Sequence, residues 1–354
     1  MANKNLNAAK TAKKDEFYTQ MTDIERELQH YWKHFRDKVV LCNCDDPYES
    51  NFFKYFALRF NQLGLKKLIC TCYDGSPLMG SELSLFALDA EGNEKKVAYK
   101  VEISEVSDMN GDGAVDLSDV EYLIKNDKNV LSCLHGNGDF RSKECIELLK
   151  EADIVVTNPP FSLFREYIAQ LLEYDKKFLI IGNQNNVTYK EVFPLLKANK
   201  VWLGYKSGDM AFKVPQDYEP RETRYWEDEE GHKWRSLGNI CWFTNLDHNK
   251  RHEELDLVWH YSQEEYHDFD NYDAINVNRV DGIPCDYSGA MGVPITFLDK
   301  YNPEQFEILN ANNFRRNENI PIKEHGLIKD KDGTINGKPT YVRILIRNKN
   351  PKTL

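Results

Sequence analysis

The chain has 354 residues, of which 41% are hydrophobic and 29% charged, so it can bury one large core or two smaller ones. No apolar run approaches the roughly 20 residues that a membrane-spanning helix needs, and the first twenty residues lack the apolar stretch of a secretory signal. These features argue against a membrane protein and predict a cytoplasmic location with no membrane partner. The eight cysteines form neither a disulfide framework nor the Cys-x-x-Cys repeats of a zinc ribbon.

The net charge of −11 is unevenly distributed along the chain. Residues 1–14 carry four lysines and no acid, and residues 315–354 carry ten basic against four acidic residues. Between residues 74 and 128, thirteen acids stand against five bases, so this stretch supplies most of the negative excess. The basic ends could contact a polyanion, although solvated termini would have the same composition.

Short apolar segments alternate with amphipathic stretches over the first 250 residues. The apolar segments predict strands at residues 39–43, 68–72, 130–134, 154–157, 178–182, 201–204 and 240–244. Apolar spacings of three and four predict helices at residues 50–62, 142–150, 163–172 and 189–198. This alternation is typical of a parallel sheet with crossover helices, so the expected fold class is α/β. Beyond residue 244 the pattern weakens, with a helix expected near residues 303–309 and a strand at 341–346.

The strand at residues 154–157 ends abruptly in Asn158, Pro159, Pro160 and Phe161. Two prolines fix a rigid turn, and in open parallel sheets ligands bind at the carboxyl ends of the strands. An asparagine oxygen and a backbone carbonyl can each accept a hydrogen bond from a planar NH₂ group, which draws its nitrogen toward tetrahedral geometry. A following aromatic ring offers a face for an extruded base. The corner therefore suits methylation of an exocyclic amine, with a proline-rich loop without chemistry as the alternative.

Four further segments accompany this corner, namely residues 15–20 (DEFYTQ), 42–47 (CNCDDP), 138–142 (GDFRS) and 291–298 (MGVPITFL). Together they resemble the EcoRI-type adenine-specific DNA methyltransferases over most of the chain. The resemblance implies a Rossmann-like, S-adenosylmethionine-dependent methyltransferase fold, with a seven-stranded, mostly parallel sheet and a C-terminal α+β recognition region. The implied product is N6-methyladenine in duplex DNA, formed by direct in-line transfer to a flipped-out base.

The resemblance also implies roles for individual residues. Asn158 and the Pro159 carbonyl would hold the target amine, Pro160 would stiffen the turn, and Phe161 would stack on the adenine. The residues expected to bind the cofactor are Phe17, Tyr18, Thr19, Asn43, Asp45, Asp46, Tyr73, Asp74, Asp139 and Phe140. Helix capping is the alternative role for Asp139 and for Asp45 or Asp46. The glycine-rich turn that usually follows the first strand of methyltransferases is missing.

The same resemblance divides the chain by function. Residues 1–248 are expected to form the catalytic domain, with an acidic insertion at about 75–128, and residues 249–354 a target-recognition region. The expected partner of this monomer is double-stranded DNA, with a cognate restriction endonuclease that acts separately. The alternatives are a methyltransferase of the same chemistry acting on RNA or a protein glutamine amide, and a non-catalytic DNA-binding protein that retains the fold.

The acidic insertion contains a second motif, at residues 108–119. Its first six positions match the calcium-loop template D-x-[DN]-x-[DN]-G, and oxygen ligands recur at positions nine and twelve. The loop resembles the calcium repeats of dockerin-type modules, where aspartate also occupies the last position. The expected ligands of a structural Ca²⁺ ion are Asp108, Asn110, Asp112, the Ala114 carbonyl, Asp116 and Asp119. A metal-free turn rich in aspartate and glycine is the alternative.

Overall fold

The structure, a computed structural model, describes residues 17–44, 50–72, 98–109, 111, 115–126, 130–311 and 333–353. These residues divide into two compact units, the first within Met1–Gln184 and Lys206–Leu246 and the second within Asn185–Tyr205 and Asp247–Leu354. Within the described ranges, none of the helices combines the length and apolarity that a bilayer span demands.

The first unit contains a sheet with its covering helices. In chain order its elements are β1 (Tyr18–Thr19), α2 (Met21–Leu28), η1 (Trp32–His34), β2 (Val39–Asn43), α3 (Asn51–Leu58), α4 (Phe60–Leu63), β3 (Lys67–Thr71), β4 (Tyr99–Ile103), α5 (Leu117–Asn126), β5 (Leu131–Cys133), α6 (Lys143–Glu151), β6 (Ile154–Thr157), η3 (Phe161–Leu163), α7 (Phe164–Glu173), β7 (Lys177–Asn183), β8 (Trp202–Val214), β9 (Tyr225–Glu227) and β10 (Lys233–Thr244). The first four residues of β8 belong to the second unit.

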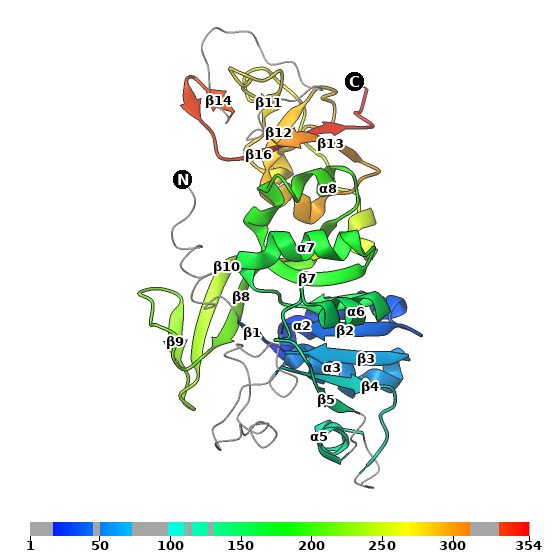
Figure 1. Cartoon of the computed structure of the whole chain (residues 1–354). Coiled ribbons are helices and arrows are strands. Elements are labelled where there is room, and N and C mark those ends of the chain that lie inside the picture. Colours follow the sequence, from blue (N-terminus) through cyan, green and yellow to red (C-terminus); the bar gives the residue numbers. More distant parts are fainter. Residues whose placement is uncertain are drawn as a thin grey trace. The chain divides into compact units, whose positions relative to one another are not determined.

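The sheet of the first unit has ten strands and mixed direction (Figure 1). Its order is β1-β8-β10-β7-β6-β2-β3-β4-β5, and β9 pairs with β10 off this path. The four strands β7, β6, β2 and β3 run parallel, whereas β10 is antiparallel to β7 and β4 is antiparallel to both β3 and β5. The predicted α/β class is confirmed, but the sheet differs from the predicted seven mostly parallel strands.

Three strands outside the seven predicted segments account for the difference in number. They are β1, β9 and β4, and β4 comes from the acidic insertion and lies between β3 and β5. Tyr99, Val101 and Ile103 of β4 are buried, while Lys100 and Glu102 between them are only partly covered. This alternation marks a strand with one face on the core. The neighbours that a strand acquires depend on tertiary placement, which the local pattern does not contain.

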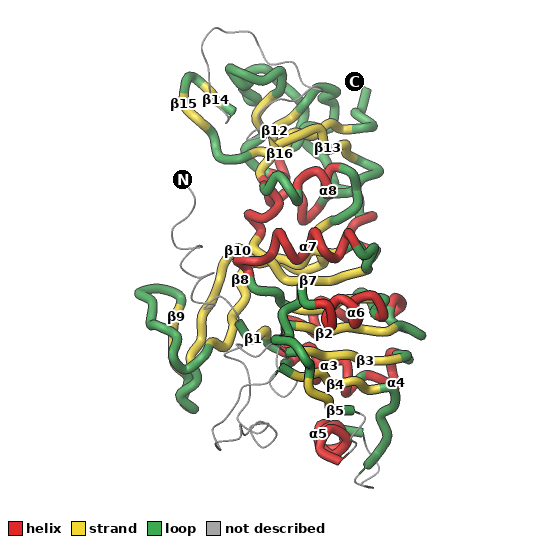
Figure 2. Tube along the Cα trace, viewed as in Figure 1, coloured by secondary structure: helices red, strands yellow, loops and turns green. Residues whose placement is uncertain are grey.

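The sheet buries residues on both of its faces. On one face, Cys42 of β2 and its register partner Cys70 of β3 pack in a core with aromatic side chains of α3, including Phe52 and Phe56. On the other, α6 contacts β2 and α7 contacts β7. Ser142 caps α6 by accepting a hydrogen bond from the Cys145 N–H at 3.3 Å. Figure 2 shows α7 in red beside β7 in yellow, where α7 is the crossover helix between the parallel strands β6 and β7.

The second unit has its own four-stranded sheet, in the order β11-β12-β16-β13, and a separate pair, β14 with β15. Its elements are η4 (Gln184–Thr188), α8 (Phe193–Lys197), η5 (Asn249–His252), β11 (Ile275–Asn276), η6 (Val280–Gly282), β12 (Met291–Pro294), η7 (Ile295–Lys300), β13 (Phe306–Ala311), β14 (Thr334–Ile335), β15 (Lys338–Pro339) and β16 (Arg343–Asn348).

Two predicted helices of this unit need correction. The predicted helix near residues 303–309 is wrong, because Phe306–Ala311 forms β13 and pairs with β16. Short apolar runs fit a buried strand as well as a helix, and only the partner strand decides between them. The helix predicted at residues 189–198 spans only Phe193–Lys197, because Pro194 has no N–H and is tolerated only in a first turn.

A buried histidine of the second unit has a strongly shifted pKa. His248 is 3% exposed, and its Nε2 donates a hydrogen bond to the Leu203 carbonyl at 3.0 Å. Burial lowers its pKa to about 4; the nearby cations of Lys250 and Arg251 lower it further, while the hydrogen bond to Leu203 opposes the shift. The folded protein therefore keeps this imidazole neutral at pH values where the unfolded chain protonates it.

We expect this histidine to make the second unit acid-sensitive. Because its folded pKa lies below the unfolded value, the unfolded state binds more protons between about pH 6.5 and 4, and stability falls as the pH drops through that window. In urea unfolding, the free energy of unfolding of the wild type should fall by about 2–3 kcal/mol more than that of His248→Gln between pH 7 and 4.5. Equal pH slopes for the two proteins would contradict this account.

Candidate active site

The order of the strands reverses between β2 and β6. From β2 the chain first builds outward to β3 and later returns to β6 on the other side of β2. The two strands end at Asn43 and Thr157, and the Thr157 hydroxyl donates a hydrogen bond to the Asn43 carbonyl. A parallel sheet opens a crevice at the carboxyl ends of its strands where the order reverses. The residues that follow β6 therefore lie where a ligand is expected.

The predicted corner stands at this position. Asn158, Pro159 and Pro160 are buried after β6, and the chain then turns through η3 into α7. Asn158 is 6% exposed, and its side-chain amide donates a hydrogen bond to the Phe17 carbonyl at 2.8 Å. Its Oδ1 is enclosed and accepts no hydrogen bond from the described residues. Buried acceptors are normally paired, so an unpaired one at a crevice is a candidate ligand contact.

Phe161 belongs to an aromatic cluster beside the corner. Its ring centroid lies 5.7 Å from that of Phe17 and 6.3 Å from that of Phe212 in β8. Phe17 also lies 5.6 Å from Phe212 and 6.1 Å from Tyr218. Phe161 itself is partly exposed, so the cluster holds this ring from one side and leaves part of it open.

The first described residues form a short segment that we call the N-terminal strap (residues 17–19). Tyr18 and Thr19 pair with Lys213 and Phe212 of β8. The Phe17 carbonyl accepts from Asn158, as described above, and the Thr19 carbonyl accepts from the Asn51 side chain at 2.7 Å. Of the predicted cofactor residues, Phe17, Tyr18 and Thr19 are thus brought next to the corner.

Asp139 and Phe140 lie between β5 and α6. Both carboxylate oxygens of Asp139 bind the Arg141 guanidinium, at 2.8 and 2.6 Å, and one also accepts from the Arg141 N–H at 2.9 Å. The guanidinium also contacts Glu166 at 2.8 Å. The hydrogen bonds that Arg141 donates to Asp139 are the largest cause that raises the pKa of Arg141 further above its ordinary value.

Tyr167 of α7 connects two of the predicted cofactor residues and was not singled out from the sequence. Its ring centroid lies 5.0 Å from that of Phe140, and its hydroxyl donates a hydrogen bond to Asn43 Oδ1. Tyr167 is completely buried. A tyrosine on the apolar face of a predicted helix is a usable signal, because a buried hydroxyl needs a polar partner.

The other predicted cofactor residues, Asp45, Asp46, Tyr73 and Asp74, lie outside the described residues. The same holds for three of the predicted calcium ligands, Asn110, Asp112 and Ala114.

The remaining calcium ligands hold the two ends of their loop together. Asp119 is completely buried and accepts hydrogen bonds from the Met109 N–H at 2.7 Å and the Asp116 N–H at 2.9 Å. Asp108 accepts from the Gly111 N–H at 2.6 Å. Met109, at the second position of the loop, therefore donates to the carboxylate of Asp119 at the last position. Among the described residues alone, Asp108, Asp116 and Asp119 do not form a group whose ligand atoms lie within 4.8 Å of one another.

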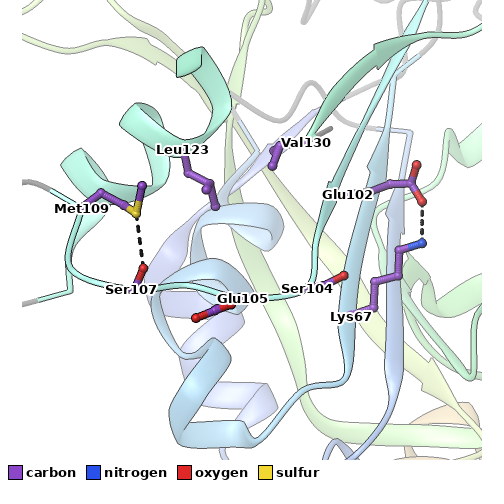
Figure 3. A pocket seen from close by; sticks show the side chains of 8 residues that line it. All are labelled: Lys67, Glu102, Ser104, Glu105, Ser107, Met109, Leu123 and Val130. Atoms are coloured by element: carbon purple, nitrogen blue, oxygen red, sulfur yellow. Dashed lines mark hydrogen bonds and ion pairs between the residues drawn. The ribbon is translucent and has the colours of Figure 1, made fainter. Parts of the chain in front are cut away.

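A hollow of about 440 Å³ lies elsewhere on the first unit (Figure 3). Lys67, the first residue of β3, and Glu102 near the end of β4 line it together with residues of the insertion. The Lys67 ammonium is bound by Glu102 at 2.5 Å and by Glu151 at 2.8 Å. Because β3 begins here, the hollow opens at the edge of the sheet opposite to the corner, and the predicted site residues are not among its lining side chains.

A buried asparagine–proline–proline corner where the strand order of an α/β sheet reverses is the arrangement of an amino-methyltransferase. Comparison with known proteins gives the particular group. The family model described as adenine-specific methyltransferase EcoRI matches residues 5–349. The chain therefore belongs to this family.

Three relatives are similar to the chain over almost their whole length. The Type II methyltransferase M.EcoRI of Escherichia coli is 50% identical over 351 residues, which are 98% of this chain and 97% of the relative. M.MgeORF184P of Mycoplasma genitalium is 37% identical and M.MpnI of Mycoplasma pneumoniae is 36% identical, each over 97% of this chain and 98% of the relative. No solved structure gave a significant match.

Membership confirms the predicted family and the predicted enzyme class. The chain is an adenine-specific methyltransferase, and the family implies S-adenosylmethionine as the methyl donor. A protein glutamine amide and a non-catalytic role, both left open by the motif alone, do not fit an adenine-specific family.

Proposed function

We propose that the chain is a sequence-specific DNA adenine-N6 methyltransferase of a Type II restriction-modification system. The relatives named above are Type II methyltransferases, and the family is adenine-specific. The enzyme transfers a methyl group from S-adenosylmethionine to an adenine flipped out of duplex DNA. The single observation that carries the chemistry is the enclosed oxygen of Asn158, which lacks a partner among the described residues.

The corner acts on an amine that is a poor nucleophile. The lone pair of an exocyclic NH₂ group is delocalised into the ring, so the free base resists methylation. Asn158 Oδ1 and the Pro159 carbonyl each accept a hydrogen bond from one N–H of the amine. These two bonds favour tetrahedral geometry at the nitrogen and direct its lone pair. Phe161 stacks on the extruded base, and Pro160 keeps the turn rigid.

The methyl donor is held by residues around the same crevice. S-adenosylmethionine supplies an electrophilic methyl carbon on a sulfonium. Asn43 lies at the end of β2, Asp139 lies between β5 and α6 as the proposed partner of the cofactor's amino group, and Phe140 packs against Tyr167. The N-terminal strap covers the corner, and Asp45, Asp46, Tyr73 and Asp74 complete the set. Transfer would be in line and without a covalent enzyme intermediate: the N–C bond would form as the sulfonium S–C bond breaks, with S-adenosylhomocysteine leaving and one amine proton released to water.

The remaining assignments concern the organisation of the protein. We propose that residues 1–248 catalyse the reaction and that residues 249–354 recognise the target sequence. We place the enzyme in the cytoplasm, where bacterial DNA lies. We expect it to act as a monomer, because one chain contains the whole corner, and a cognate endonuclease cuts the DNA separately. The compact units described above support a division of labour of this kind.

The corner can be tested by removing the Asn158 amide. We expect Asn158→Ala to lower the single-turnover methylation rate about a thousandfold or more, because one of the two amine acceptors is lost. The rate is measured at saturating DNA and cofactor, so that a raised dissociation constant does not account for the loss. Transfer of labelled methyl to plasmid DNA, followed by mapping of the modified adenines, measures the effect. Near-normal methylation by this variant, with Asn61→Ala as the folded control, would remove the proposed role.

The role of Asp139 can be separated from its bond to Arg141. If Asp139 binds the cofactor, Asp139→Ala should weaken cofactor binding about tenfold or more, as expected for a lost hydrogen bond to a charged group. Arg141→Ala should change it by less than about threefold. Calorimetric titration with the cofactor distinguishes the two. Equal losses in both variants would show that Asp139 serves only to anchor the arginine.

We also propose that residues 108–119 bind a structural Ca²⁺ ion. The expected donors are all oxygen atoms, which this cation prefers. The hydrogen bonds of Asp119 to Met109 and Asp116 support the proposal, because they draw the two ends of the loop together, as a ligand shell requires.

Calcium should then stabilise the protein, and Asp112→Ala should lose that response. Saturating calcium is expected to raise the melting temperature of the wild type by about 2–4 °C for each kcal/mol of binding free energy. Glu105→Ala, an acid removed just before the loop, should respond as the wild type does. Scanning calorimetry with calcium or a chelator measures this, and the site is refuted if Asp112→Ala responds as strongly as the wild type.

A further inference from the structure

The N-terminal strap determines which atom Asn158 offers to a ligand. A side-chain amide carries an oxygen acceptor and a nitrogen donor of nearly equal size, so its hydrogen-bond partners decide its orientation. The Asn158 nitrogen donates to the Phe17 carbonyl at 2.8 Å, which leaves Oδ1 as the atom offered elsewhere. The reversed amide would place oxygen against the Phe17 carbonyl and would meet an incoming amine with a second donor. Only the observed orientation can clamp an NH₂ group.

The strap is held on two sides. The carbonyls of Phe17 and Thr19 both accept hydrogen bonds from side chains that lie outside β8. One accepts from Asn158 and the other from Asn51, at 2.8 and 2.7 Å. The strand β1 has only two residues on the edge of the sheet, so its pairing with β8 alone is a weak anchor. Phe17 packs against Phe161 and Phe212, and the bond from Asn51 adds a directional hold on the Thr19 end of the strap.

Asn51 is well placed for this task. It is the first residue of α3, whose N-cap is Ser50, with a side-chain bond to the Phe53 N–H at 3.3 Å. Its position is thus set by a capped helix that packs in the core through Phe52 and Phe53. The contacts therefore run from the start of α3 through the Asn51 side chain to the Thr19 carbonyl, and from the Phe17 carbonyl of the same strap to Asn158.

We propose that Asn51 is a positioning residue for methyl transfer: by holding the Thr19 carbonyl it fixes the strap, and the strap's Phe17 carbonyl orients the Asn158 amide. The proposal rests on the role of Asn158 proposed above. It extends the site to a residue that contacts neither the amine nor the methyl group. Loss of this anchor lets the strap move and the amide reorient, so that fewer enzyme molecules present an acceptor at the moment of reaction.

The test uses Asn51→Asp in the full-length enzyme. Aspartate has the same shape but cannot donate, and its charge repels the Thr19 carbonyl. At the first turn of a helix a carboxylate is favourable, so the melting temperature should change by no more than about 2–4 °C. We expect the single-turnover rate at saturating DNA and cofactor to fall about tenfold or more. Saturating concentrations keep any weaker cofactor binding, which a looser strap also predicts, out of this rate. A residue that only fills space would tolerate this isosteric change.

Two further variants make the outcome decisive. Asn51→Ala removes the donor without adding charge and should lower the same rate constant. Asn61→Asp breaks a matched bond, from a side-chain amide to the Val106 carbonyl at 2.8 Å, and should leave the rate unchanged. A rate within twofold of the wild type for both Asn51 variants overturns the proposal. So does a loss that disappears at higher cofactor concentration, because the strap would then act on cofactor binding.

The two proposals fail in different ways. If Asn158→Ala remains active, the amine clamp itself is wrong. If Asn158→Ala is inactive while Asn51→Asp and Asn51→Ala turn over normally, the clamp stands and only the positioning role of Asn51 is lost.

Discussion

The hydrogen bond that the Asn158 amide donates to the Phe17 carbonyl connects the asparagine–proline–proline corner to the N-terminal strap. It uses the donor half of the amide and leaves the acceptor half enclosed and available. Leaving a buried acceptor without a partner costs about 1–3 kcal/mol, a cost that a substrate amine would relieve. An unpaired oxygen of this kind suits a ligand with N–H groups, and an exocyclic amine, the substrate proposed above, has two. The aromatic cluster around Phe161 adds a surface on which such a base can lie.

The sheet explains why this corner can form here. Parallel pairing of β2, β6 and β7 brings the ends of several strands to one edge, and the reversal of order beside β2 opens a crevice there. Tyr167 joins both sides of that crevice through Asn43 and Phe140. The acidic insertion adds β4 at the far side of the sheet. The strands β3 and β2 thus separate β4 from the corner that follows β6.

Three polar side chains of the first unit each hold a backbone segment in place through a hydrogen bond. Asn51 and Asn158 hold the strap, and Asp119 holds the ends of the acidic loop. Such bonds are short in range and directional, so they fix the backbone of short segments in a better-defined geometry than apolar packing does. This suits a two-residue strand at a sheet edge and a loop made mostly of small polar residues. In both cases the ordering of a short segment depends on a few named atoms.

Much of this protein could be inferred from local patterns. Apolar runs bounded by turn residues predicted the strands that border the crevice. Residues 158–161 predicted the corner, because two prolines restrict the backbone locally and need no distant partner to do so. The number of strands, the place of β4 and the strand at residues 306–311 were not accessible, since they depend on which segments meet in space. The same holds for Asn51 and Tyr167, whose roles arise from partners 32 and 124 residues away. Sequence neighbours define the chemical groups of the corner, whereas long-range hydrogen bonds, formed only once the sheet is assembled, decide which way its amide faces.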